Sequence, residues 1–317
     1  MIANKIWAAL DNPEHYIEPC FGSGAVLLAR PGWTPARNFS ETVNDINGFV
    51  SNVWRALKYK PAETAEWADY PVNHADLIAR RKVLLANESN LLKNLVNDDV
   101  WCDPKIAGYW IWAASCWIGS GLTCPNATGK RPHLAGKGMG VHKSSVVGKI
   151  PHLADKGVGV HKSSVTDIYD WFEKLSERLR YVRVVCGDWS RVCGGDWQDK
   201  KWKDVGIYFD PPYSDTDRDN VYGEQDSFTI GLDIEKWCIE RGARSNYRIV
   251  VSGYDTEYKT LVEAGWRTER WKTGGGYSGI ARNGKDTRGK QNRRREMLFY
   301  SPHCHVNQDA LDFGKDE

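Results

Sequence analysis

The sequence predicts an α/β fold with a doubly wound, largely parallel sheet, and three observations support this prediction. Short segments of strand character alternate with segments of helical periodicity in residues 1–60 and again in residues 167–317. The segment Val205–Phe209 is apolar at nearly every position, as expected for a strand that is covered on both faces. A glycine turn, Gly22–Gly24, separates a short strand from an apolar helix. Alternating units of this kind build parallel sheets with helices on both faces.

Two strand–helix units are predicted in the first 60 residues. His15–Glu18 is expected to be a strand, and Ala25–Ala29 is expected to be the helix that follows the glycine turn. Phe39–Asn44 is the second predicted strand. Asp45 is expected to open the next helix, because apolar residues recur with a helical period over 46–57.

The composition changes after Pro61, and residues 61–166 are predicted to form an inserted, mainly helical region. Asp76–Val96 places leucines at helical spacing among arginines and lysines, which favours a helix. Ala107–Gly119 is uncharged, but its 13 residues are too few to cross a bilayer, so a buried helix is expected.

Residues 130–167 contain a duplicated basic segment. Lys130–Gly148 and Lys149–Asp167 agree at 14 of 19 positions, and the pair carries seven basic and two acidic residues, a local charge of +5. Its glycines and its lack of apolar periodicity predict a long surface loop. A second basic segment, 271–295, carries eight basic residues and one acidic residue, a charge of +7. Both segments are expected to contact phosphate groups of DNA, the alternative being solvated charged loops. The residues expected to make these contacts are Lys137, Lys143, Lys156, Lys162, Arg288, Lys290, Arg293 and Arg294.

The alternation of strands and helices returns after Asp167. The predicted strands are Tyr181–Cys186, Val205–Phe209 and Arg248–Ser252, followed by an antiparallel pair, Trp266–Trp271 with Glu296–Tyr300. The predicted helices are Tyr169–Leu179, Leu232–Arg241 and Tyr258–Ala264. The catalytic domain is therefore expected to comprise residues 1–60 and 167–317.

The composition excludes several classes of protein. The 43 basic and 41 acidic residues give a net charge of +2. The net charge by itself therefore does not predict binding to nucleic acid. Eight cysteines are scattered without a C-x-x-C pair, which argues against a zinc ribbon or a disulfide framework. His303-Cys304-His305 has no second ligand pair nearby, so no metal is expected. No signal peptide or membrane span is apparent, and a cytoplasmic protein is expected.

The most specific motif is Asp210-Pro211-Pro212-Tyr213, directly after the apolar strand Val205–Phe209. Open α/β sheets place their sites at the carboxyl ends of strands. The exocyclic amine of a nucleobase is a poor nucleophile, because its lone pair is delocalised into the ring. The Asp210 carboxylate and the Pro211 carbonyl can accept both amine hydrogens and free that lone pair, and Tyr213 can stack on the base. The alternative is a rigid proline-rich turn.

Three further motifs are typical of a nucleotide site. In Glu18-Pro19-Cys20-Phe21-Gly22-Ser23-Gly24, the glycine turn allows a cofactor to approach the backbone, although Leu27 replaces the third glycine of the dinucleotide fingerprint. Asp45 follows the second strand, where a ribose-binding acid is expected, with a helix cap as the alternative. Gly187-Asp188 follows Tyr181–Cys186 and can hold an adenine amine; Gly195-Asp196-Trp197 repeats the pattern.

These motifs, in this order, resemble those of the Dam-like group of DNA adenine methyltransferases of phages and bacteria. The resemblance covers nearly the whole chain and includes the closing segment Arg294–Tyr300. It implies a Rossmann-like S-adenosylmethionine-dependent methyltransferase sheet with an inserted target-recognition module at 61–166. Glu18, Pro19, Phe21, Gly22, Ser23 and Gly24 would line the S-adenosylmethionine site, Asp45 would bind its ribose, and Gly187 and Asp188 would contact its adenine. Asp210, Pro211, Pro212 and Tyr213 would hold the target adenine of double-stranded DNA, as in restriction–modification enzymes.

Two features depart from the family pattern. Cys20 stands where the family usually has phenylalanine, and the glycine-lysine motif that precedes the family's first helix is not present. A catalytically weak, methylase-like DNA-binding protein therefore stays open as an alternative. Methylation of RNA or of the exocyclic amine of cytosine also stays open, because Asp210–Tyr213 chemistry permits both.

Overall fold

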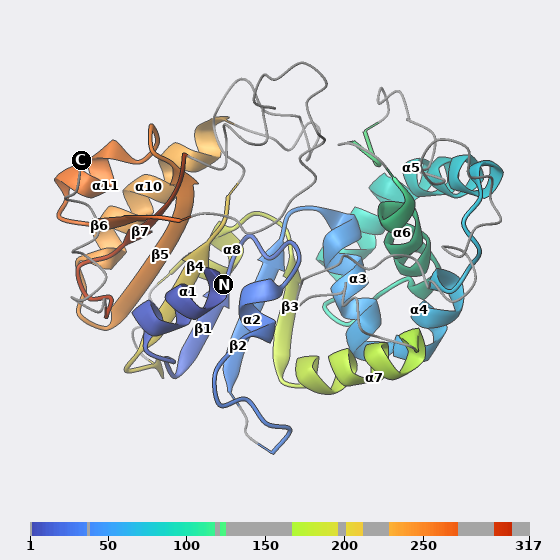
Figure 1. Ribbon diagram of the computed structural model, residues 1–317, viewed down its shortest axis with the longest axis horizontal. Helices are drawn as coiled ribbons and strands as arrows, with labels where there is room; N and C mark the ends of the chain where they lie inside the picture. Colours follow the sequence, from blue (N-terminus) through green and yellow to red (C-terminus); the bar gives the residue numbers. More distant parts are fainter. Residues whose placement is uncertain are drawn as a thin grey trace, which may run out of the picture.

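Seven strands form one mixed sheet in the order β3-β2-β1-β4-β5-β7-β6 (Figure 1). The computed structural model describes residues 2–36, 39–117, 121–124, 167–195, 201–211, 228–271 and 295–305. Strands β1 to β5 are parallel, whereas β7 runs antiparallel to both β5 and β6. The sheet is thus mostly parallel and is compatible with a Rossmann-like fold. The strands are β1 (His15–Glu18), β2 (Ser40–Asp45), β3 (Val182–Cys186), β4 (Val205–Phe209), β5 (Tyr247–Tyr254), β6 (Arg267–Arg270) and β7 (Glu296–Tyr300).

Helices cover both faces of this sheet. One core cluster joins Tyr16 of β1 and Tyr208 of β4 to Trp7 of the first helix and Trp54 of the third. The other joins the alternate strand side chains, such as Ile207, to the helices near the end of the chain. The helices are α1 (Ile2–Leu10), α2 (Ala25–Leu28), α3 (Gly48–Tyr59), α4 (Pro61–Ala68), α5 (His74–Asn97), α6 (Pro104–Cys116), α7 (Ile168–Leu179), α8 (Ser190–Cys193), α10 (Phe228–Gly242) and α11 (Lys259–Glu263).

The expected start of helix α3 at Asp45 is wrong by three residues. The helix begins at Gly48, because Asn47 is its N-cap: the side-chain oxygen of Asn47 accepts from the backbone N–H groups of Phe49 and Val50. A side-chain acceptor in this position satisfies amides that have no partner inside the helix. Asp45 instead ends strand β2, which leaves its carboxylate for other contacts.

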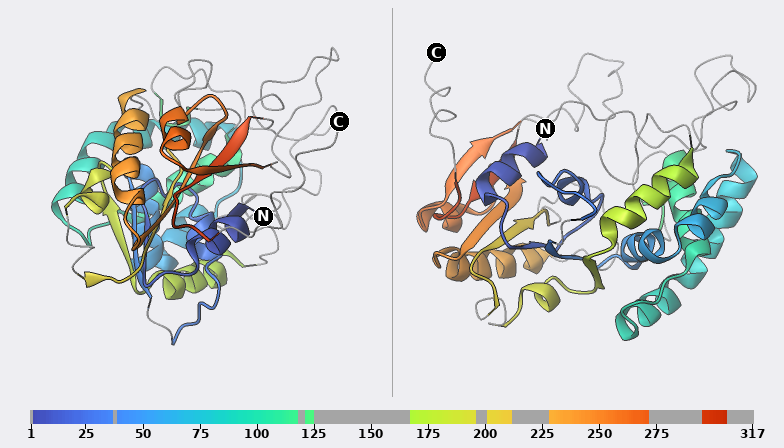
Figure 2. Two further views of the ribbon diagram at one scale, coloured as in Figure 1. Left: turned by 90° about the vertical axis from the view of Figure 1, so that its left-hand side faces the viewer. Right: turned by 90° about the horizontal axis from the view of Figure 1, so that it is seen from below.

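Helices α4, α5 and α6 pack with α3 and α7 beyond the β3 side of the sheet (Figures 1 and 2). Gly108 allows α6 to approach α4 closely, since a Cβ there would lie 2.4 Å from the Cβ of Trp67. The Arg80 guanidinium lies over three aromatic rings, with ring centroids 4.2 to 4.4 Å away, and donates to the Trp67 carbonyl. The fully buried Trp112 donates to the Tyr70 carbonyl. Trp67 and Trp112 therefore belong to this helical core. The separation of residues 61–166 as an inserted module stays a prediction.

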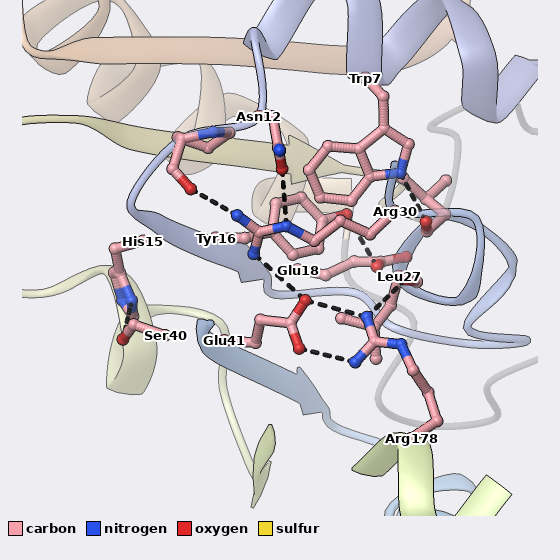
Figure 3. Close-up of polar contacts among 12 residues, drawn as sticks. Trp7, Asn12, His15, Tyr16, Glu18, Leu27, Arg30, Ser40, Glu41 and Arg178 are labelled. Atoms are coloured by element: carbon pink, nitrogen blue, oxygen red, sulfur yellow. Dashed lines mark hydrogen bonds and ion pairs between the residues drawn. The ribbon is translucent and has the colours of Figure 1, made fainter. Parts of the chain in front are cut away.

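Glu41 of β2 lies at the centre of a buried ionic cluster that fixes helix α2 (Figure 3). Its carboxylate accepts from Arg178 of α7 at 2.7 and 2.9 Å and from Arg30 at 3.1 Å. Arg178 also donates to the Leu27 carbonyl at 2.7 Å, and Arg30 donates to Asn12 at 2.9 Å. The cluster connects β2 and α7 to the helix that follows the glycine turn.

None of the helices in the described ranges combines the length and the apolar character needed to cross a membrane. Helix α6, which contains most of the uncharged segment Ala107–Gly119, begins earlier, at Pro104, ends at Cys116 and is packed among other helices.

Candidate active site

The carboxyl ends of β1, β2, β3 and β4 meet at the point where the strand order reverses. The chain runs outward from β1 through β2 to β3 and returns on the other side of β1 as β4. Ligands of open α/β sheets bind at this switch point, outside the carboxyl ends of the strands. Glu18 and Asp45 are the last residues of β1 and β2, Asp210 directly follows β4, and Gly187-Asp188 follows β3.

The glycine turn after β1 leaves open space beside its backbone. Gly22 and Gly24 have φ angles of +50° and +67°, the left-handed region that other residues rarely adopt. A Cβ on Gly22 would meet nothing within 4 Å, whereas a Cβ on Gly24 would lie 2.7 Å from the Trp54 ring. Trp54 also donates to the Gly22 carbonyl at 2.9 Å. Gly24 is therefore required for packing, and Gly22 is the position where a ligand can approach the turn.

The Asp45 carboxylate joins two turns. One oxygen accepts from the backbone N–H of Gly22 and the other from that of Asn47, each at 2.8 Å. Burial raises the pKa of Asp45 to about 6, and these two hydrogen bonds oppose that rise. The side chain therefore lies against the glycine turn, where a ribose-binding acid was expected, and it does not cap helix α3.

Asn44 is a site residue that was predicted only as the last residue of a strand. Its side-chain N–H₂ donates to the Pro19 carbonyl and to the Gly187 carbonyl, both at 2.9 Å. One buried amide thus ties the end of β1 to the end of β3. Its oxygen has no hydrogen-bond partner within the part of the chain that the structure describes. The only sequence signal for this role was its position at the end of a predicted strand.

Glu18 lies beneath the turn with 2% of its surface exposed. The Tyr16 hydroxyl donates to its carboxylate at 2.8 Å. Burial raises the pKa of Glu18 well above its usual range, the hydrogen bond from Tyr16 opposes this, and the charge of Asp210 raises it further. The Glu18 carboxyl group therefore keeps its proton to a higher pH than an exposed glutamate does.

Asp210 is exposed at the end of β4, and the next residue, Pro211, is buried. The charge of Asp210 also contributes to the raised pKa of Cys20 and Tyr208, for both of which burial is the larger cause. Asp210 therefore lies near the carboxyl ends of β1 and β4. Pro212 and Tyr213 lie outside the described residues, so the rest of the motif stays a prediction.

The end of β3 forms the fourth side of the site. Gly187 has a φ of +142°, and a Cβ there would lie 2.6 Å from Cδ of Arg191. Asp188 is exposed and accepts from the backbone N–H of Ser190 at 2.9 Å. Trp189 packs edge-on against Phe209 at 5.8 Å, so its ring contributes to the core between β3 and β4.

The predicted DNA contacts Lys137, Lys143, Lys156, Lys162, Arg288, Lys290, Arg293 and Arg294 lie outside the described residues. So do Asp196 and Trp197, the repeat of the Gly187-Asp188 pattern.

The side chains of His303-Cys304-His305 have separate partners. Cys304 donates to the Ile249 carbonyl, whereas His303 contacts the Ala243 carbonyl and His305 lies near Asp11. Across the described ranges, no group of three or more His, Cys, Asp or Glu side chains is arranged to hold a metal ion.

A search against models of protein families finds no match, and no curated protein matches the chain.

Proposed function

We propose that this chain transfers a methyl group from S-adenosylmethionine to the exocyclic amine of adenine in DNA. The proposal is supported above all by one observation: four motifs that are far apart in the sequence end four adjacent strands at the switch point of the sheet. The motifs are the Gly22–Gly24 turn, Asp45, Gly187-Asp188 and Asp210-Pro211. Their order and residue types resemble those of the Dam-like DNA adenine methyltransferases.

The described residues fit the cofactor. Open space beside Gly22 accommodates a ligand against the turn, and Asp45 directly beside it offers carboxylate oxygens to ribose hydroxyls. Asp188 is exposed at the next strand end, where it can accept from an adenine amine. Glu18, Pro19, Phe21, Ser23 and Gly24 complete the turn. When bound, S-adenosylmethionine supplies a methyl group that is activated by its positively charged sulfonium.

Asp210 and Pro211 would act on the target amine. The exposed Asp210 carboxylate accepts one amine hydrogen, and the Pro211 carbonyl accepts the other. Together they draw the nitrogen toward tetrahedral geometry and make its lone pair available as a nucleophile. Pro212 restricts the backbone of the residue before it to extended conformations, which fixes the direction of that carbonyl. The adenine would reach this position by leaving the duplex and stacking on Tyr213.

The function is tested by incubating the protein with S-adenosylmethionine and either DNA or RNA, followed by mass spectrometry of the digested nucleosides. We expect N6-methyladenine in DNA alone. N4-methylcytosine or methylated RNA would reassign the substrate. If no methylated nucleoside appears, calorimetry with S-adenosylmethionine separates a binding protein without activity from a chain that does not bind the cofactor.

The role of Asp210 is tested by Asp210→Ala. Removing one preorganised acceptor from an active site costs on the order of 10²–10³ in kcat, and we expect a loss of this size with unchanged affinity for S-adenosylmethionine. Asp170→Ala is the matched control, because Asp170 is an exposed carboxylate on α7 and should leave kcat unchanged. Full activity of Asp210→Ala would refute the role of Asp210.

A further inference from the structure

A basic groove follows the free edge of β3. This strand is the terminal strand of the sheet, with β2 as its neighbour on one side and α3 beside it (Figure 1). The groove has a volume of about 230 Å³ and lies between the end of α3, the end of α5 and the segment 180–186. It reaches Arg191, and therefore runs from the amino end of β3 to the edge of the candidate active site.

Cations dominate the lining of this groove. Five basic residues line it, against Asp99 as the single acid; the basic residues are Arg55, Lys58, Arg180, Arg183 and Arg191. An adjoining hollow of about 550 Å³ has mixed charge, because Glu173 and Glu177 line it together with Lys58, Lys174 and Arg180. The excess of positive charge is therefore larger along the edge of β3 than in this hollow.

Two of these cations already have structural partners. Arg55 donates to the Val184 carbonyl at 3.1 Å, and Lys58 donates to the Val182 carbonyl at 2.7 Å. Both carbonyls belong to β3, so these side chains cover an edge that would otherwise be open for pairing with another strand. Such coverage makes the addition of a peptide strand at this edge unfavourable.

The other three cations are available. Arg180, Arg183 and Arg191 are exposed, and none of them pairs with a carboxylate among the residues that the structure describes. By contrast, the buried Arg30 and Arg178 are both paired with Glu41. Strand β3 (Val182–Cys186) is extended and spans about 13 Å at ~3.3 Å per residue. Duplex DNA carries one phosphate per strand for about every 3.4 Å of its axis, so the groove has room for several nucleotides.

Aromatic rings alternate with these cations. Tyr59 and Tyr181 line the groove with 43% and 45% of their surfaces exposed. Lys58 lies 5.0 Å from the ring centre of Tyr59, and Arg180 lies 5.4 Å from that of Tyr181. Basic grooves with interspersed aromatic side chains are typical of proteins that bind single-stranded nucleic acid, so with a duplex it is the cations that make the contact.

We infer that the groove along β3 binds the phosphate backbone of a nucleic acid next to the candidate active site. The inference rests on the proposed function for the identity of the polymer, DNA, and it adds a contact made by the sheet edge itself. The sequence alone did not indicate this surface, because Arg180, Arg183 and Arg191 are separated by other residues, Asp188 among them, and form no basic run.

The test uses Arg180→Ala combined with Arg183→Ala in the full chain. Binding to a fluorescein-labelled 30-base-pair duplex is followed by anisotropy between 50 and 300 mM NaCl. Each phosphate contact contributes about 0.9 to the slope of log K against log salt, which is about eightfold in affinity at 0.1 M. We expect the slope to fall by about 2 and the affinity at 0.1 M to fall about 60-fold.

Two control variants accompany this measurement. Lys236→Ala with Lys259→Ala removes the same charge from exposed positions on α10 and α11, and should change affinity less than twofold. Arg180→Lys with Arg183→Lys keeps the charge and should keep the slope. The inference is overturned if the arginine-to-alanine variant binds like the unaltered protein, if the lysine-to-alanine control loses as much, or if the unaltered protein binds no DNA at 50 mM NaCl.

The same variants distinguish this inference from the proposed function. If methylated nucleosides form but the arginine-to-alanine variant keeps the salt slope of the unaltered protein, the proposed methyltransferase activity stands and DNA binding in the groove is excluded. If the variant has a reduced slope but no methylated nucleoside forms, DNA binding in the groove stands and the methyltransferase activity is excluded.

Discussion

Asp45 combines a buried position with hydrogen bonds from two turns, and its charge therefore affects stability. Its carboxylate accepts from the N–H groups of Gly22 and Asn47, yet burial raises its pKa from 3.8 to about 6. The folded protein binds this proton more tightly than the unfolded chain does. Stability is therefore lost as the pH rises between about 4 and 6, and the loss is complete above that range.

Asp45→Asn tests this linkage. The variant cannot titrate, so the difference in unfolding free energy between it and the unaltered protein should change with pH. A pKa rise of about two units corresponds to ~3 kcal/mol. Between pH 4 and pH 7, we expect the unfolding free energy of the variant to rise by about that amount relative to the unfolding free energy of the unaltered protein. Urea unfolding at several pH values measures the change, and a constant difference would contradict the raised pKa.

Glu41 offers a second prediction at a single residue. Glu41→Gln leaves two buried guanidinium groups, those of Arg30 and Arg178, facing a neutral amide. Breaking a buried ion pair costs about 3–5 kcal/mol, and urea unfolding should show a loss of this size. The control is Glu63→Gln on α4, because Glu63 pairs with Lys60 and both side chains are exposed; it should cost less than about 1 kcal/mol. Equal losses would show that the buried cluster contributes little.

The two glycines of the turn between β1 and α2 have different structural roles: Gly24 packs against Trp54, whereas Gly22 borders open space. Gly24→Ala should destabilise the protein by about 2–4 kcal/mol, because left-handed strain adds to overpacking against Trp54. Gly22→Ala should cost only ~1–2 kcal/mol, but should weaken S-adenosylmethionine binding because its methyl group enters the open space. Calorimetry and urea unfolding measure the two effects.

Gly265→Ala is the matched control for Gly22→Ala. Gly265 has a φ of +86°, and a Cβ there would also meet nothing within 4 Å, but it lies between α11 and β6. It should show the same loss of stability without any change in cofactor affinity. If Gly22→Ala binds the cofactor as Gly265→Ala does, the turn is not the binding surface.

The strands and longer helices could be predicted from the sequence, because apolar runs and turn residues mark them. β1 and β4 have the predicted bounds, and the predicted antiparallel pair forms as β6 and β7. The first turn of α3 was placed too early because Asp45 and Asn47 are both residues that cap helices well, and only the tertiary contact with Gly22 separates them. Helices α4 and α8 were not predicted; with eight and four residues, they are too short for periodicity to identify.

The candidate site could be predicted only in part. Acids and glycines at strand ends are visible in the sequence, and the parallel sheet brings those ends together. Asn44 was missed in its linking role because its two partners, Pro19 and Gly187, are far apart in the sequence. The groove along β3 was missed for the same reason: it is formed by α3, α5 and β3, and no local pattern connects them.

For the whole molecule, the net charge of +2 conceals an uneven distribution. The segments 130–167 and 271–295 carry +5 and +7, so the remaining residues sum to 2 − 12, or −10. We expect DNA affinity to fall steeply with salt despite the small net charge. Neutralising Arg288, Lys290, Arg293 and Arg294 together should reduce the slope of log K against log salt by about 3–4. A shallow slope in the unaltered protein would exclude both segments as DNA contacts.

The pairing of β1 with β4 has a consequence for synthesis of the chain on the ribosome. His15 pairs with Val205, and Glu41 binds Arg178 at a separation of 137 residues. When the N-terminal strands have left the ribosome but β4 and Arg178 have not yet been synthesised, one edge of β1 is unpaired and Glu41 lacks one of its two cations. Open strand edges promote aggregation, and contacts between distant residues form slowly. The nascent chain is therefore most vulnerable until β4 emerges, and chaperone dependence should be greatest during translation of the middle of the message.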